Sequence, residues 1–299
     1  MNKQNVAVIG LGSMGLGIAC SALRGGHRVW GAEPNPVQMA KFRSDGGELE
    51  APIKVADVLD AVVVVVVNAA QTKDVLFGDT GIVPKMRKGA VVVSCATVPP
   101  EFARKMAALC TEHGVHYLDA PISGGVQKSM NGRLTIMASG SADAFDAARP
   151  VLCAISETLF ELGDQVGAGS AMKSVNQMLA GVHIAVMAEA VTFGMTQGVT
   201  PDKFIEVISK CAGTSWMLEN RAPHIAAGDY TPHSSVNIWP KDLGIVMDIA
   251  GSAGFDAPIT MAALNQFNTA VDMGLGREDD AAVAKVYAYQ TGLTLPGTE

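Results

Sequence analysis

The feature that most constrains the fold is a glycine-rich turn between a short apolar run and a helical segment. Residues 6–9 have the pattern of a buried strand, and residues 13–24 have the composition of a helix. In such a turn, the first glycine permits a tight bend, the second lets the backbone approach a pyrophosphate, and the third lets strand and helix pack closely. The start of the helix presents unpaired N–H groups to the phosphates. The turn therefore predicts a dinucleotide site formed by Gly10, Leu11, Gly12, Ser13, Met14 and Gly15, unless the glycines serve packing alone.

Strand and helix patterns alternate through the first half of the chain. Residues 62–67 are six consecutive valines, a density of β-branched side chains that is typical of a strand buried on both faces. This alternation predicts a doubly wound, Rossmann-type α/β sheet. Further strands are expected at 27–31, 90–93, 115–118, 134–138 and 158–162, with helices at 36–44, 99–112 and 142–155.

Helical patterns replace strands after Gly163. An uninterrupted helical pattern runs from residue 170 to about residue 197, and glycine or proline separates most of the later segments. We therefore expect a Rossmann domain over residues 1–164 and an all-helical domain over residues 165–299, joined by the long helix. Later helices are expected at 201–211, 215–227, 240–253, 258–273 and 279–290.

Composition excludes several classes of partner. The 299 residues carry a net charge of −7, which argues against nucleic acid, since phosphates require a basic face. The longest purely apolar run, residues 61–67, is far too short to span a membrane, and the N-terminus has a strand pattern rather than a secretory signal. The five cysteines form neither a CxxC nor a CxxH pattern, so we expect a cytoplasmic protein without disulfides or a metal site.

A carboxylate near the end of the second expected strand bears on the choice of dinucleotide. Glu33 lies 23 positions after Gly10, where it can accept hydrogen bonds from the adenosine ribose and repel a 2′-phosphate. No arginine occurs in Gly31-Ala-Glu-Pro-Asn35, so the sequence favours NAD over NADP. Alternatively, Glu33 is a solvated loop residue and Asn35 makes the contact.

Polar residues also follow the later strands of the expected sheet. Asn68 ends the valine run and Thr97 follows the next strand, so both are expected to line the nicotinamide side of the site unless they are helix N-caps. Within Asp119-Ala-Pro-Ile-Ser-Gly-Gly125, Ser123, Gly124 and Gly125 offer a hydroxyl and closely spaced N–H groups that suit a carboxylate. A plain glycine turn is the alternative there.

Lys173 is unusual because cations are scarce in its half of the chain. Residues 151–299 contain seven Lys and Arg against sixteen Asp and Glu. Lys173, Asn176 and Gln177 share one face of a mostly apolar helix. Desolvation beside a positively charged nicotinamide favours the neutral amine, which suits proton transfer. The alternative is a surface lysine whose stem covers apolar neighbours. Taken alone, Lys241-Asp242 and His233 are ordinary helix-start and loop residues.

Four motifs in order resemble the β-hydroxyacid dehydrogenase family, which includes the 3-hydroxyisobutyrate dehydrogenases. They are Gly10–Gly15, residues 119–125, residues 167–177 and Lys241-Asp-Leu243, and the resemblance covers nearly the whole chain. It implies NAD-dependent oxidation of a small hydroxy acid, without a metal, by a homodimer or homotetramer. It makes Lys173 the catalytic residue, adds Asn68, Ala69, Thr97 and Lys241 as cofactor or active-site contacts, and adds Ser123, Gly124, Gly125, Asn176, Gln177 and His233 as substrate contacts.

Within this family, several segments are most similar to members that oxidise L-threonate. They include Val67-Asn-Ala-Ala-Gln71, Ser215-Trp-Met217 and Gly228-Asp-Tyr-Thr-Pro-His233. Many members carry asparagine four residues after the lysine, whereas this chain has Gln177, whose amide reaches one methylene further. A polar pocket around Ser215 and His233 would favour a polyhydroxylated acid. A 3-hydroxyisobutyrate or tartronate semialdehyde enzyme, or a dinucleotide-binding regulator without turnover, remains the alternative.

Overall fold

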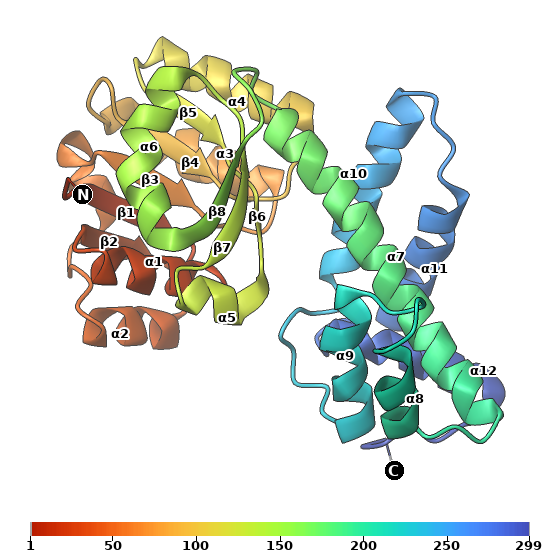
Figure 1. The fold of residues 1–299 in the computed structure, drawn as a ribbon. Helices are drawn as coiled ribbons and strands as arrows, with labels where there is room; N and C mark the ends of the chain where they lie inside the picture. The colour runs from red at the N-terminus through yellow and green to blue at the C-terminus, as the bar shows by residue number, and fades with distance from the viewer. Residues whose placement is uncertain (1, 299) are drawn as a thin grey trace. The chain divides into compact units, whose positions relative to one another are not determined.

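The computed structural model describes residues 2–298, and the chain divides into two compact units. Met1–Lys173 forms the first unit and Ser174–Glu299 the second. Strands belong to the first unit, from the red to the yellow-green part of the ribbon, and the second unit is built from helices (Figure 1). The doubly wound α/β domain followed by a helical domain is therefore confirmed. The end of the Rossmann domain at residue 164 remains a prediction.

A parallel sheet of five strands forms the centre of the first unit. The strand order is β2-β1-β3-β4-β5, so the order reverses between β1 and β3, where doubly wound sheets bind ligands at the carboxyl ends. The strands are β1 (Asn5–Ile9), β2 (Arg28–Ala32), β3 (Ala61–Val64), β4 (Val91–Ser94) and β5 (His116–Asp119).

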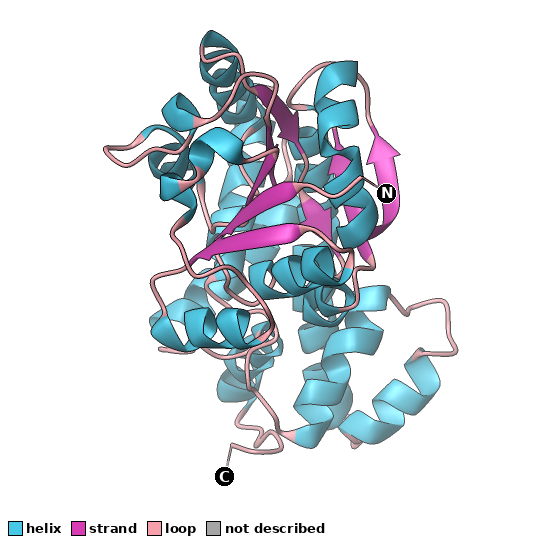
Figure 2. Cartoon of the chain, turned by 90° about the vertical axis from the view of Figure 1, so that its left-hand side faces the viewer, coloured by secondary structure: helices cyan, strands magenta, loops and turns pink. Residues whose placement is uncertain are grey.

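Helices cover both faces of this sheet, as Figure 2 shows. Val63 and Val93 pack with α1 and α6 on one face, whereas Val62 and Val64 pack with α3 and α4 on the other. The valine-rich strands therefore bury both faces, as their composition predicts. These helices are α1 (Gly15–Arg24), α3 (Ala69–Phe77), α4 (Pro100–Glu112) and α6 (Ala142–Ile155), and α2 (Pro36–Ser44) follows β2.

The valine strand is shorter than its composition suggests. Its regular pairing ends at Val64 because β1 ends at Ile9 and β4 ends at Ser94, so no neighbouring strand continues beyond that point. Val67 is 57% exposed, and its N–H donates to Gln71 Oε1 at 2.9 Å. The last three valines therefore form the loop into α3, a helix that was not among those expected from the sequence.

A smaller sheet of three strands completes the first unit. Its order is β6-β7-β8, with β6 antiparallel and β8 parallel to β7. The strands expected at 134–138 and 158–162 are present, the second beginning two residues earlier and ending one residue earlier than expected, whereas β6 and the short helix after it lack any clear sequence pattern. These elements are β6 (Ile122–Ser123), β7 (Leu134–Ala138), β8 (Ser156–Glu161) and α5 (Gly125–Met130).

The second unit packs helices around its own apolar core. Ile184, Leu218, Trp239 and Phe267 are among its buried side chains. The long helix α7 (Ala168–Thr196) begins in the first unit and continues into the second, as the sequence predicts. The other helices are α8 (Pro201–Ile208), α9 (Trp216–Ala227), α10 (Ile238–Ser252), α11 (Pro258–Asp272) and α12 (Ala284–Thr291).

Helix α7 is also long and apolar enough to cross a membrane. Its most apolar window of 18 residues has a mean hydropathy of 1.6, and 39% of that window is buried. Counting uninterrupted apolar residues overlooks this helix, because small and polar residues interrupt the run. A core helix of a soluble protein meets the same test of length and composition, so this finding is weak evidence for a membrane.

Candidate active site

The three glycines of the first turn have different geometric roles. Gly10 has φ +91°, and a Cβ there would lie 2.4 Å from the carbonyl oxygen of Val65. A Cβ on Gly15 would lie 1.8 Å from the carbonyl oxygen of Gly10. In contrast, a Cβ on Gly12 would meet nothing within 4 Å. Packing requires glycine at positions 10 and 15 but not at position 12, so this side of the turn is open to a ligand.

The start of α1 fits a dinucleotide phosphate. Its N-cap residue, Met14, makes no side-chain hydrogen bond to the helix, and the first turn contains no acidic residue. Uncapped N–H groups and the positive end of the helix dipole attract anions. The local chemistry of Gly12, Ser13 and Met14 therefore suits the pyrophosphate of NAD.

Glu33 braces this turn from the end of β2. Its Oε2 accepts the N–H of Leu11 at 2.9 Å, and its Oε1 accepts the N–H of Asn35 at 3.0 Å. Asn35 in turn caps α2 by accepting the N–H of Val37 at 2.9 Å. A carboxylate has about four lone-pair sites, so Glu33 can hold the backbone and still accept ribose hydroxyls. Neither Glu33 nor Asn35 is a simple solvated loop residue.

Of the two polar residues expected at strand ends, one is a helix cap. Asn68 Oδ1 accepts the N–H of Gln71 at 2.9 Å, so Asn68 caps α3 and Ala69 is its first residue. The amide N–H groups of such a cap can still donate to a ligand. Thr97 is not a cap, because α4 begins at Pro100 with Pro99 before it. The cofactor contacts of Asn68, Ala69 and Thr97 remain predictions.

The turn from Ser123 to Gly125 has a backbone that only glycine adopts readily. Ser123 ends β6, and Gly124 and Gly125 have φ values of +134° and +73°. A Cβ on Gly125 would meet nothing within 4 Å. Successive N–H groups in such a conformation form a concave anion site. The turn can therefore accommodate a carboxylate, and the substrate contacts of Ser123, Gly124 and Gly125 remain predictions.

Lys173 is buried beside this turn rather than spread over the surface. Lys173 is 8% exposed, and its Nζ donates a hydrogen bond to the carbonyl oxygen of Ile122 at 2.9 Å. Ile122 directly precedes Ser123 in β6. The structure thus brings the predicted base to the predicted carboxylate site.

Asp119, at the end of β5, holds the start of α7. Its Oδ2 accepts the N–H of Ser170 at 2.8 Å, and its Oδ1 accepts the Ser170 hydroxyl at 2.6 Å. Burial raises the pKa of Asp119, and hydrogen bonds from Ser170 and Gly167 oppose this effect without cancelling it. No role for Asp119 follows from the sequence, where its one signal is an acidic residue that ends an apolar strand.

In the second unit, two predicted residues contact one buried carboxylate, and a third contacts one of these two. Gln177 Nε2 donates to Asp242 Oδ2 at 2.5 Å, Asn176 Nδ2 donates to Gln177 Oε1 at 2.9 Å, and Lys241 forms an ion pair with Asp242. Asp242 is 3% exposed. It is therefore not a solvated helix start, and it lies in the second turn of α10, which begins at Ile238.

His233 belongs to a different cluster. Its N–H donates to Asp279 Oδ2 at 2.9 Å, and its ring stands edge-on to His224 at 4.8 Å between centroids. Asp279 also contacts His224 Nδ1 at 2.9 Å. Burial alone would raise the pKa of Asp279, but hydrogen bonds from His224 and two backbone N–H groups lower it overall. A substrate contact by His233 remains a prediction.

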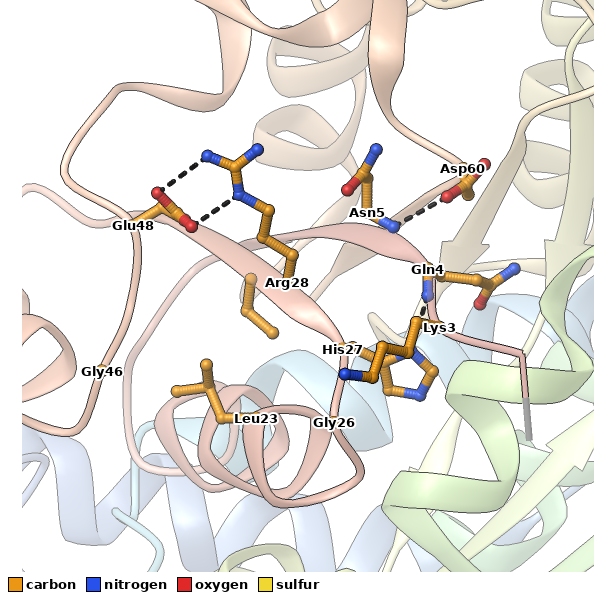
Figure 3. A pocket seen from close by; sticks show the side chains of 11 residues that line it. Lys3, Gln4, Asn5, Leu23, Gly26, His27, Arg28, Gly46, Glu48 and Asp60 are labelled. Carbon is orange, nitrogen blue, oxygen red and sulfur yellow. Dashed lines mark hydrogen bonds and ion pairs between the residues drawn. The ribbon is translucent and has the colours of Figure 1, made fainter.

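A cavity of about 420 Å³ lies at the opposite end of the main sheet (Figure 3). It is lined near the first residues of β1 and β2, including Asn5 and Arg28. Its charges are largely paired, since Arg28 contacts Glu48 at 2.6 Å. Doubly wound sheets bind cofactors at the carboxyl ends of their strands, so this cavity is not the dinucleotide site.

Comparison with known proteins assigns both parts of the chain. Residues 5–163 match the NAD binding domain of 6-phosphogluconate dehydrogenase. Residues 167–287 match the family described as NAD-binding of NADP-dependent 3-hydroxyisobutyrate dehydrogenase.

Individual relatives match from end to end. L-threonate dehydrogenase of Cupriavidus necator is 45% identical over 296 residues, covering 99% of each chain. The 2-(hydroxymethyl)glutarate dehydrogenase of Eubacterium barkeri is 34% identical over 98% of this chain and 97% of its own. The crystal structure of 3-hydroxyisobutyrate dehydrogenase from Salmonella typhimurium superposes with a TM-score of 0.91 at 43% identity, covering 95% of this chain and all of that one.

The fold and these matches define an NAD-dependent hydroxyacid dehydrogenase. More closely, the chain belongs to the 3-hydroxyisobutyrate dehydrogenase-like family of β-hydroxyacid dehydrogenases. The resemblance stated from the motifs is confirmed, including the similarity to L-threonate dehydrogenase. The protein is an enzyme that acts on a small hydroxy acid, so a regulator without turnover is no longer an alternative.

Proposed function

We propose that this enzyme oxidises L-threonate to its 2-oxo acid, with Lys173 as the general base. The observation that supports the base most directly is the 2.9 Å contact from Lys173 Nζ to Ile122 O, next to Ser123. The name of the relative from Cupriavidus necator and the glutamine at position 177 support the substrate.

In this proposal each residue has one task. The Ser123 hydroxyl and the N–H groups of Gly124 and Gly125 hold the carboxylate of the acid. Lys173, as the neutral amine, takes the hydroxyl proton while the C–O single bond becomes a carbonyl. Bound NAD supplies the acceptor for the hydride that leaves the same carbon. Gln177 or Asn176, one turn further along α7, orients the substrate hydroxyls, and Glu33 selects NAD.

The choice of substrate follows from the cost of unpaired polar groups. A site that hydrogen-bonds extra hydroxyls loses those partners when the substrate carries a methyl group instead. Each buried group left unpaired costs about 1–3 kcal/mol. Two such groups would discriminate by tens to thousands of fold. The similar structure from Salmonella typhimurium is of a 3-hydroxyisobutyrate dehydrogenase, so this acid is the competing candidate.

Steady-state kinetics distinguishes the two acids. We would measure kcat/KM for L-threonate, 3-hydroxyisobutyrate and 2-(hydroxymethyl)glutarate at one pH with saturating NAD. L-threonate should give the highest value. Gln177→Asn, which shortens the amide arm but keeps its chemistry, should narrow the gap to 3-hydroxyisobutyrate. If 3-hydroxyisobutyrate equals or exceeds L-threonate in the wild type, the substrate is wrong, while the role of Lys173 can stand.

We further infer, from the family resemblance, a homodimer or homotetramer in the cytoplasm. One observation supports self-association: α7 exposes apolar side chains at spacings of three, four and seven residues, which places them along one stripe. These are Met172, Val175, Leu179, Val186 and Phe193, each at least 45% exposed. Exposed apolar patches of this kind are typical of protein interfaces.

A further inference from the structure

The first turn of α7 rests on one buried side chain. Asp119 is 1% exposed and accepts three hydrogen bonds from this turn: the N–H of Gly167 at 3.1 Å, and the N–H and hydroxyl of Ser170. Ser139 holds the same turn, because its hydroxyl oxygen accepts a hydrogen bond from the N–H of Gly169 at 3.0 Å. The first N–H groups of a helix have no partner within the helix, so a carboxylate here fixes where the helix begins.

The contacts of Asp119 and Ser139 leave the start of α7 little room to shift. A Cβ on Gly169 would lie 2.5 Å from the carbonyl oxygen of Met137 and 2.7 Å from that of Asp119. The backbone of α7 therefore lies directly against the ends of β5 and β7. Any movement of this turn would change the distances to Asp119 as well.

The same segment of chain also contacts the lysine. Lys173 follows Ser170 by three residues, about 4.5 Å along a helix axis. Its Nζ donates to the carbonyl oxygen of Ile122, three residues after Asp119. Three functions therefore lie within five consecutive residues. Asp119 holds the start of α7, Ile122 accepts a hydrogen bond from the Lys173 amine, and Ser123 belongs to the proposed carboxylate site.

We propose that Asp119 is a positioning residue for proton transfer: by fixing the first turn of α7, it places the Lys173 amine beside Ser123. Being buried, Asp119 acts through the helix rather than on the substrate. This inference rests on the proposed role of Lys173. A misplacement of about 1 Å between reacting groups can cost on the order of 10²-fold in rate.

Asp119→Asn tests this role because it keeps the shape but replaces one accepting oxygen with an NH₂ group. That group faces donors from Ser170 or Gly167, so the first turn must shift. We expect kcat to fall about 10- to 100-fold, while KM for NAD stays within twofold of the wild type. The acidic limb of the kcat–pH profile should move to lower pH, since loss of a nearby negative charge favours the neutral amine.

The matched control is Ser141→Ala. Ser141 caps α6 in the same unit by accepting the N–H of Ala144 at 3.2 Å, so its loss lowers Tm without touching α7. We expect kcat and the pH profile of this variant to match the wild type. For a folded Asp119→Asn, a kcat within twofold of the wild type, or a fall without any movement of the pH profile, would overturn the proposal.

A milder variant covers the case in which Asp119→Asn does not fold. Ser170→Ala removes the hydroxyl donor to Asp119 Oδ1 but keeps the carboxylate, and should lower kcat several-fold while KM for NAD and the pH profile stay close to the wild type. Wild-type kinetics in this variant would equally overturn the proposal. Lys173→Ala separates the two hypotheses. If Lys173→Ala keeps its activity, the assignment of Lys173 as the general base is wrong. If Lys173→Ala is inactive while Asp119→Asn has wild-type kinetics, only the positioning role of Asp119 is contradicted.

Discussion

At the scale of single residues, polar side chains near Lys173 are buried and apolar ones are exposed, the reverse of the usual pattern on a helix. Its apolar neighbours Met172 and Val175 are about half exposed, whereas Lys173 and Gln177 are buried. Buried polar groups are costly unless they are hydrogen-bonded, and both side chains have partners here. Such an arrangement favours a functional rather than a structural reason for the lysine.

Replacing this lysine tests its role directly. In Lys173→Ala, loss of the proton acceptor should lower kcat by roughly 10²–10⁴-fold. Binding of NAD, followed by fluorescence titration, should be nearly unchanged, because the glycine turn is untouched. Lys203→Ala is a suitable control, since this lysine lies on the surface of α8 and pairs with Glu206. A Lys173→Ala enzyme that keeps more than half of the wild-type kcat on the true substrate would contradict the assignment.

Glu33 is expected to select NAD over NADP. Its carboxylate would repel a 2′-phosphate, so the wild type should show the higher kcat/KM with NAD. Glu33→Gln removes the charge but keeps an oxygen for the backbone of the turn, and should narrow this preference. Glu48→Gln, which removes a surface charge paired with Arg28, should leave the preference unchanged. Equal efficiency of the wild type with both cofactors would defeat this expectation.

At the scale of elements, long periodic patterns predict the structure well and short ones do not. Helix α7 follows from an uninterrupted helical pattern, and the valine-rich strands follow from composition, because β3 and β4 are buried along their whole length. The end of β3 could not be foreseen, since pairing stops where β1 and β4 stop rather than where the valines end. The two residues of β6 are too few to show a period.

The first unit should lose stability in mild acid through His27. Its Nδ1 accepts the N–H of Gln4 at 3.2 Å (Figure 3), and its Nε2 lies 3.2 Å from the carbonyl oxygen of Pro150. Burial lowers the pKa of His27 below its usual value of 6.5. As the pH falls below 6.5, His27 takes up a proton more readily in the unfolded chain than in the folded one. The contribution of His27 to the free energy of unfolding is therefore fully present well above pH 6.5 and declines below it.

Thermal unfolding between pH 7.5 and pH 5.5 measures this effect. The wild type should lose Tm over this range, and His27→Gln should lose less because the titrating group is gone. His113→Gln is the matched control, since His113 lies exposed at the end of α4. The expectation fails if His27→Gln shows the same dependence on pH as the wild type.

At the scale of the whole molecule, motifs locate the chemistry but not the side chains that support it. The resemblance to a known family points to Lys173 and Gln177, and the glycine turn could be proposed from spacing. Asp119 and Asp242 could not, because their partners are distant in sequence: Ser170 lies 51 residues from Asp119, and Gln177 lies 65 residues from Asp242. Contacts of this kind are fixed by the tertiary fold, which a single sequence does not reveal.

The valine run has a consequence for how the chain survives denaturation. In the native sheet β3 lies between β1 and β4, so its edges are covered. In the unfolded chain the same uncharged, β-branched segment is a template for intermolecular strands, and such segments drive aggregation. Its native partners β1 and β4 lie before and after it in the sequence, and they must pair with β3 before a strand of another molecule does. Recovery after dilution from denaturant should therefore decline as protein concentration rises, because aggregation through this strand competes with folding.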